Sequence, residues 1–130
     1  MTQEDYCSYE VAKLLKEKGF DTPCMGRYSV RSKEFHLDCT KMCNNGGLFE
    51  CAAPTHQMAM KWLREVHNKH CDIGYDIDLY WFFQIIELKE LIEHFDYSET
   101  KYYHAENETG FNAYEDAVEA ALKYALEKLI

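Results

Sequence analysis

Apolar residues recur at helical spacing in three segments of the chain. These segments comprise residues 8–18, 55–68 and 112–130. Because a period near 3.6 places such residues on one face, each segment is predicted to form an amphipathic helix. Ser8 stands where a capping side chain begins the first helix, and Gly19 stands where a left-handed glycine ends it. Asn112, with Glu115 three residues later, is predicted to cap the third helix in a similar way.

The second helix is predicted to bury one stripe of large apolar side chains. This stripe comprises Ala59, Trp62, Leu63 and Val66, and Met58 extends it. Met60 lies at the border of the stripe or outside it. Tryptophan and methionine at such spacing are typical of a packed core, so no cofactor role is assigned to them.

Segments that alternate between apolar and polar residues lie between the helices and predict strands. They comprise residues 27–31, 34–38, 71–77, 80–88 and, with a weaker pattern, 100–106. The first two are expected to pair as a hairpin through Ser32 and Lys33. The strand residues predicted to point inward include Tyr28, Val30, Phe35, Leu37, Ile73, Tyr75 and Ile77. Residues 88–95 fit either a helix or a continued strand.

The order of these segments predicts one α+β domain over residues 1–130, with an antiparallel sheet and three helices. From residue 55 onward the order is α-β-β-β-α. Double-stranded RNA-binding domains share this order, but the order of elements alone does not assign a function.

The strand at residues 79–88 is apolar on both faces. One face carries Leu79, Trp81, Phe83 and Ile85, and the other carries Tyr80, Phe82, Gln84, Ile86 and Leu88. A strand with one wet face alternates, so this strand is either covered on both sides within the chain or meets another chain. The second interpretation predicts an interaction surface for a protein partner or a second copy of the chain. Its residues are Tyr80, Trp81, Phe82, Phe83 and Ile85.

The net charge of −9 is confined to one half of the chain. Residues 1–65 hold nine basic and nine acidic side chains, whereas residues 66–130 hold five basic and fourteen acidic ones. Direct nucleic-acid binding is not expected, because that affinity comes from clustered Lys and Arg. The polar start of the chain and the lack of a bilayer-length apolar stretch predict no secretory signal, no membrane association and a cytoplasmic location.

Six cysteines need an interpretation in a reducing compartment, where disulfides are rare. His36, Cys39, Cys43 and Cys51 are candidate zinc ligands, but the second pair of closely spaced ligands that zinc modules usually have is missing. Buried thiols that act as small hydrophobic side chains are the favoured interpretation. No metal and no cofactor are therefore predicted.

The sequence contains no phosphate-binding loop, no HExxH motif and no GxSxG motif. The absence of these motifs in a small chain favours a non-enzymatic protein. A binding module for a small molecule or nucleotide is the alternative, in which aromatic side chains stack on a ring and arginines bind an anion. The candidate arginines are Arg27, Arg31 and Arg64.

Three runs of this sequence resemble short uncharacterised proteins encoded by phages, prophages and mobile elements of Bacteroidetes. The runs are residues 8–21 with Pro23 and Cys24, residues 53–55 followed by 61–67, and residues 114–122 continuing to Ile130. The resemblance implies no activity and no catalytic residues. It implies an accessory protein inside a bacterial host cell. We expect such a protein to bind a host or phage protein, and a counter-defence factor is one version of this expectation.

Overall fold

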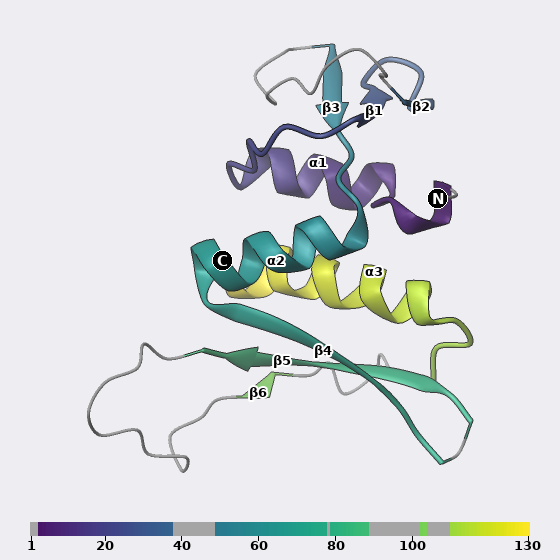
Figure 1. Cartoon of the computed structure of the whole chain (residues 1–130), viewed down its shortest axis with the longest axis vertical. Coiled ribbons are helices and arrows are strands. Elements are labelled where there is room, and N and C mark those ends of the chain that lie inside the picture. The colour runs from purple at the N-terminus through teal and green to yellow at the C-terminus, as the bar shows by residue number, and fades with distance from the viewer. Residues whose placement is uncertain (1–2, 38–48, 78, 89–101, 104–109) are drawn as a thin grey trace.

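The computed structural model describes residues 3–37, 49–77, 79–88, 102–103 and 110–130. The helices lie between two small antiparallel sheets (Figure 1). The first sheet has the strand order β2-β1-β3 and the second has the order β4-β5-β6. The predicted α+β class is confirmed, but the strands form two sheets rather than one.

Helix α1 spans Tyr9–Glu17 and follows a short 3-10 turn, η1, at Gln3–Asp5. Both predicted ends are confirmed. The Ser8 side chain accepts a hydrogen bond from the N–H of Val11, and Gly19 has a φ of 92°. The N–H of Phe20 then donates to the carbonyl of Leu15, which is the geometry of a Schellman motif.

Helix α2 spans His56–His67, with Thr55 as its N-cap and left-handed Asn68 at its end. The buried face is rotated relative to the predicted stripe. Met60 is 4% exposed, whereas Val66 is 57% exposed, so these two predictions were wrong. The face is rotated because the start of α2 also packs inward, with His56 buried.

Helix α3 spans Tyr114–Tyr124 and continues into a π-helical segment, η3, at Ala125–Leu129. The predicted Asn112 cap was wrong. The N-cap is Ala113, which makes no side-chain capping bond, and Asn112 is exposed. The buried face of α3 contains Ala117, Val118, Ala121 and Leu122, and its two alanines allow close packing.

The first sheet pairs β1 (Gly26–Ser29) with β2 (Phe35–Leu37) and with β3 (Glu50–Ala52). The predicted hairpin is confirmed, but β3 was not predicted. Val30 and Leu37 were expected to be inward and are exposed, because they lie at the ends of a short sheet whose buried side chains include Tyr28 and Ala52.

The second sheet contains β4 (Lys69–Tyr75), β5 (Trp81–Glu87) and β6 (Tyr102–Tyr103). The C-terminal order α2-β4-β5-β6-α3 agrees with the prediction. Tyr75 and Ile77 were predicted inward and are 54% and 93% exposed, because the β4–β5 hairpin extends past the helices that cover it (Figure 1). Residues 89–95 lie outside the described residues, so the helix-or-strand alternative there stays open.

The main core lies where the helices meet the second sheet. It includes Leu15, Phe20 and Leu63 from the α1 and α2 side and Leu122 and Ile85 from the α3 and β5 side. Among the helices that the structure describes, none has the length and hydropathy needed to cross a bilayer.

Candidate functional site

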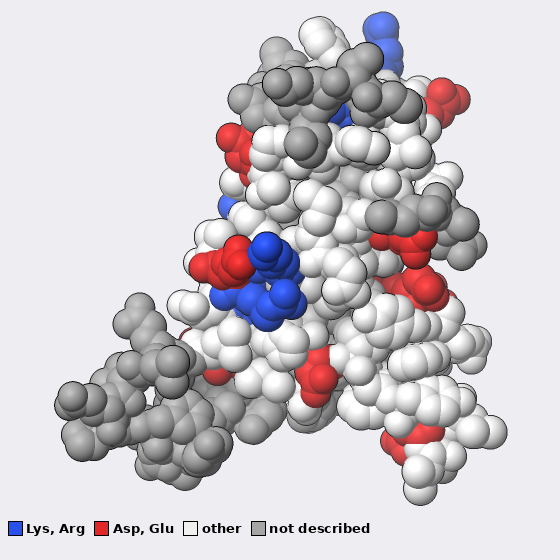
Figure 2. Space-filling view, in the orientation of Figure 1, with Lys and Arg blue, Asp and Glu red and all other residues white. Residues whose placement is uncertain are grey.

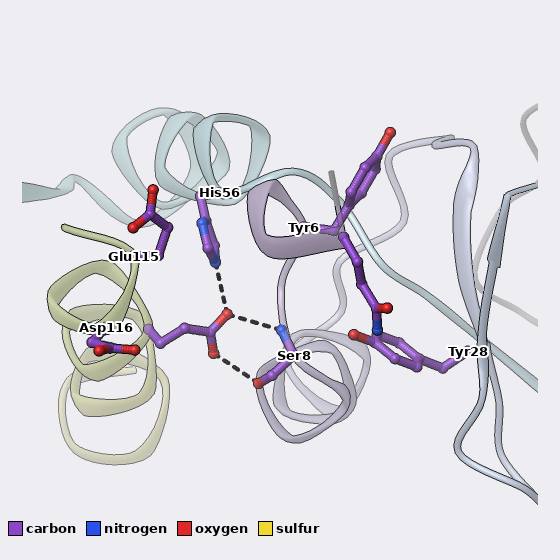
Figure 3. Close-up of a pocket in the computed structure, with 8 residues that line it drawn as sticks. Tyr6, Ser8, Tyr28, His56, Glu115 and Asp116 are labelled. Carbon is purple, nitrogen blue, oxygen red and sulfur yellow. Dashed lines mark hydrogen bonds and ion pairs between the residues drawn. The ribbon is translucent and has the colours of Figure 1, made fainter. Parts of the chain in front are cut away.

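Helices α1 and α2 begin beside one carboxylate, that of Glu119 in the second turn of α3 (Figure 3). The backbone N–H of Ser8 donates to Glu119 Oε1 at 2.9 Å, and the Ser8 hydroxyl donates to Oε2 at 2.7 Å. His56 Nε2 lies 2.7 Å from Oε1. Ser8 caps α1 and His56 is the first residue of α2, so Glu119 ties the starts of both helices to α3.

The segments that precede α1 and α2 are held together by backbone bonds. The N–H of Cys7 donates to the carbonyl of Pro54 at 2.9 Å, and Tyr6 forms an isolated bridge with Thr55. The Tyr28 hydroxyl donates to the Cys7 carbonyl at 2.8 Å. These bonds fix the positions of Cys7 and Ser8 relative to the start of α2.

The Glu119 carboxyl is held in its ionised form. Burial alone raises its pKa, but the hydrogen bonds from His56 and Ser8 outweigh burial and lower the pKa below the usual value. An ionised carboxylate only accepts hydrogen bonds, so His56 Nε2 carries the proton in this contact. His56 itself is 5% exposed.

Cys7 lies directly beside this pair. Its Sγ, one ring nitrogen of His56 and one carboxylate oxygen of Glu119 all lie within 4.8 Å of one another. Burial, and then the negative charge of Glu119, raise the pKa of the Cys7 thiol well above its usual value. Without another ligand, Cys7 is therefore a protonated thiol and a poor nucleophile.

The same bonds determine what the Ser8 hydroxyl can do chemically. In a nucleophilic triad, the hydroxyl donates to a histidine, and the carboxylate orients the other ring nitrogen. Here the Ser8 hydroxyl and His56 Nε2 both contact the Glu119 carboxylate. The Ser8 oxygen also accepts the capping bond from Val11 at 3.2 Å. The arrangement thus holds a carboxylate in place and does not activate the serine.

A cleft of about 570 Å³ opens above the Ser8–His56–Glu119 contacts. Its lining residues are Gln3, Tyr6, Ser8, Tyr28, His56, Glu115, Asp116 and Glu119. We call it the acidic cleft, because three carboxylates line it and none of the described Lys and Arg residues does. A smaller cavity of about 250 Å³ shares His56 and Glu115 with it and adds Asp5 to the lining.

The charges on the visible surface follow this arrangement. In Figure 2, acidic side chains lie on the side where α1 and α3 begin, and no described Lys or Arg is visible beside them. The largest group of basic side chains in the same view lies near the C-terminal end of α2, next to an acidic side chain. Neither Glu115 nor Asp116 forms an ion pair with another described residue.

The structure divides the five residues of the predicted interaction surface. Phe83 and Ile85 are 4% and 0% exposed and belong to the core, so they were wrongly placed on a surface. Trp81 is half-buried, with its ring against that of Tyr114. Phe82 lies on the other face of the strand, where its ring covers Gly74 so closely that a Cβ there would lie 2.4 Å from it. Tyr80 is half-buried.

The three arginines predicted as anion ligands belong to separate elements, and none lines the acidic cleft. Arg27 is buried in β1, with Nη1 3.8 Å from Glu50 Oε2. Arg31 is exposed in the turn after β1, and Arg64 is half-buried on α2.

The predicted zinc candidates are not brought together in the part that the structure describes. Cys39 and Cys43 lie outside the described residues. His36 is level with Arg27 across the first sheet, whereas Cys51 is level with Tyr28. Successive residues of a strand point to opposite faces, so His36 and Cys51 face opposite sides of the sheet. Cys7, Cys24, Cys51 and Cys71 are free and buried, which confirms the interpretation of thiols as core side chains for these four.

The Cys7–His56–Glu119 cluster was not found from the sequence. His56 and Glu119 are 63 residues apart, and no motif spacing connects them. The available signals are local: Ser8 fits a helix cap, and acidic side chains such as Glu115, Asp116 and Glu119 are favoured near the start of α3 by the helix dipole. The convergence depends on how the three helices pack.

Comparison with known proteins gave no match, whether to protein-family models, to curated proteins or to solved structures.

Proposed function

We propose that this protein is a non-catalytic binding protein whose acidic cleft takes a basic segment of a partner protein. The observation that carries the proposal is the lining of the cleft, in which Glu115, Asp116 and Glu119 face a cavity without any Lys or Arg. A Lys or Arg side chain of the partner is the group that complements this lining.

The three carboxylates contribute in different ways. Glu119 is already bonded to His56 and Ser8 and is fixed in place. Glu115 and Asp116 form no ion pair with described residues, so they remain able to bind a cation. Tyr6 and Tyr28 add aromatic surface to the cleft, on which the methylene stem of Lys or Arg can pack.

A nucleotide-binding function, the alternative from the sequence, receives less support from this site. Carboxylates repel phosphate, and Arg27, Arg31 and Arg64 do not line the cleft. The acidic cleft therefore favours a cationic ligand over an anionic one.

The test is fluorescence anisotropy with a fluorescein-labelled hexa-arginine peptide. The cleft variant Glu115→Gln/Asp116→Asn is compared with Glu17→Gln/Glu127→Gln, which removes the same charge at exposed positions outside the lining. We expect the cleft variant to bind about fivefold more weakly or worse, because charge-assisted hydrogen bonds are lost. The control variant is expected to stay within about twofold, because long-range exposed charges are screened by salt.

Three outcomes contradict the proposal. The first is that the unmodified protein does not bind the peptide. The second is that both variants lose peptide affinity equally. The third is that ATP raises the melting temperature of the unmodified protein and of the cleft variant alike. The second would indicate a non-specific attraction to the net charge of −9, and the third would support the nucleotide alternative.

The resemblance of the three helical runs supports a setting inside a bacterial cell. There we propose that the partner is a host or phage protein, with a host defence protein as one target. A second copy of the chain as partner stays a prediction, which a solution mass of twice 15.4 kDa would support.

A further inference from the structure

We propose that Cys7, His56 and Glu119 form a binding site for a transition-metal ion of the zinc class at the floor of the acidic cleft. This site goes beyond the proposed binding of a basic segment and does not depend on it. The proposal rests on three donor atoms of three kinds, a sulfur, a nitrogen and an oxygen, that come from three helix regions and lie within 4.8 Å of one another.

The spacing of these atoms is close to what a tetrahedral ion needs. Bonds of about 2.0–2.3 Å to sulfur, nitrogen and oxygen place neighbouring ligand atoms roughly 3.5 Å apart. The contact between His56 Nε2 and Glu119 Oε1, now 2.7 Å, would open by less than about 1 Å. The thiol sulfur, at most 4.8 Å from the other two, would approach by a similar amount.

The chemistry of the donors selects the class of ion. Thiolate and imidazole suit zinc and its neighbours among the transition metals, whereas magnesium and calcium take oxygen ligands. A set of one thiolate, one imidazole and one carboxylate provides the three protein ligands that an open zinc site has. Because the cleft reaches His56 and Glu119, water or a ligand can occupy the fourth position.

The surrounding bonds already hold two of the three ligands, Glu119 and Cys7. The Ser8 hydroxyl bonds the second oxygen of Glu119 at 2.7 Å, which orients the carboxylate. The backbone of Cys7 is bonded on both sides, by Pro54 and by Tyr28. Side-chain movement alone is therefore sufficient to close the cluster around an ion.

Binding changes the protonation of two ligands. The Cys7 thiol releases one proton to solvent and binds as the thiolate. The His56 ring binds the ion in its neutral form, with its proton on Nδ1 if Nε2 is the ligand atom. The ion adds two positive charges and the thiolate adds one negative charge, which together offset only part of the charge of the three carboxylates. Because Glu115 and Asp116 stay negatively charged, the cleft can still bind a cation.

The competing explanation is a buried histidine–carboxylate pair beside an ordinary core cysteine. All four described cysteines are buried, so the burial of Cys7 beside the pair is not by itself evidence for metal binding. The two explanations differ in whether removing the thiol changes metal binding.

The test is metal binding by the purified full chain, first with zinc and then with cobalt(II) as a spectroscopic probe. Three variants are compared: Cys7→Ala, Cys24→Ala as a buried thiol outside the cluster, and Cys39→Ala/Cys43→Ala for the ligand set suggested by the sequence. We expect about one equivalent of zinc and a thiolate-to-cobalt absorption band in the unmodified protein. Cys7→Ala should lose both, and the other two variants should keep both.

The proposal is overturned if the unmodified protein binds less than about a tenth of an equivalent of zinc. It is also overturned if Cys7→Ala keeps the cobalt band, or if Cys39→Ala/Cys43→Ala loses it. Circular dichroism checks that each variant folds. The cobalt band of the unmodified protein tests the proposal even if a variant fails to fold, because it needs no substitution. Because the hexa-arginine assay is run separately on metal-free protein, failure of one proposal is distinguishable from failure of the other.

Discussion

Helix α2 begins and ends with a histidine, and the two histidines have opposite surroundings. His56, the first residue, has Nε2 2.7 Å from the carboxylate of Glu119. His67, the last residue, has Nε2 buried without a hydrogen-bond partner among the described residues. Its ring packs against Trp62 at 4.8 Å between centroids. Burial, and then the charges of Lys69 and Lys18, lower the pKa of His67.

Helix position and residue type therefore do not decide the role of a histidine in α2. The dipole of α2 favours an anion at its start and a cation at its end. At the start, α3 supplies that anion as Glu119, and Glu115 and Asp116 extend the negative charge into the acidic cleft. At the end, a neutral histidine packs on an aromatic ring, and basic residues occupy the neighbourhood. Binding chemistry is therefore expected at the start of α2.

The largest expected effect comes from removing the carboxylate at the start of α2. Glu119→Ala leaves the Ser8 N–H, the Ser8 hydroxyl and His56 without their partner. We expect a loss of about 3 kcal/mol in the free energy of unfolding, because three hydrogen bonds to an ionised carboxylate are lost from a part-buried site. Urea unfolding measures this loss. Glu127→Ala, at an exposed position of η3, should change stability by less than about 0.5 kcal/mol, and an equal effect in both would contradict the account.

The second effect is a loss of stability on acidification in two separate pH windows. The folded pKa of His67 is lowered from 6.5, so the unfolded chain takes up this proton first and stability falls as the pH drops below 6.5. The folded pKa of Glu119 is lowered from 4.5, so a further loss follows as the pH falls below 4.5. Melting temperatures from pH 8 to pH 3 test both windows.

Variants assign each window to one end of α2. Glu119→Gln should flatten the lower part of the pH profile and keep the upper part. His67→Phe, which keeps an aromatic ring beside Trp62, should do the reverse. A profile that neither substitution changes would show that other groups cause the acid sensitivity.

The smallest effects concern the caps of α2. Thr55→Ala removes the side-chain acceptor for the N–H of Met58 and should cost about 1 kcal/mol. Asn68 has a φ of 56°, which glycine adopts without strain, so Asn68→Gly should change stability by only a few tenths of a kcal/mol, in the stabilising direction. Thermal unfolding of the two variants checks the opposite signs. If Asn68→Gly lowers the free energy of unfolding, the interactions of the Asn68 side chain contribute more to stability than the relief of backbone strain by glycine.

Much of the fold follows from local patterns in the sequence. The apolar periodicity of both helices and the cap at Ser8 predict α1 and α2, because they depend on residues within a few positions of each other. The burial of Met60 and the exposure of Val66 could not be predicted in the same way, since they depend on how the start of α2 packs. The division into two sheets has the same origin: the helices separate the strands.

The candidate site was less accessible to sequence reasoning than the fold. Ser8 and Glu119 are 111 residues apart, and each has an adequate local explanation, one as a cap and the other as a charge near a helix start. Phe83 and Ile85 illustrate the converse. Their pattern suggested an exposed partner surface, but the helices cover one face of β5, and only the other face, with Phe82, is left outside the core.

The most direct test of the account is the ¹H–¹⁵N correlation spectrum of the labelled protein during titration with the hexa-arginine peptide. We expect the largest shifts at Ser8, His56, Glu115 and Asp116, with little change around His67. Largest shifts at the end of α2 or on the β4–β5 hairpin, or small shifts spread evenly over the surface, would contradict it.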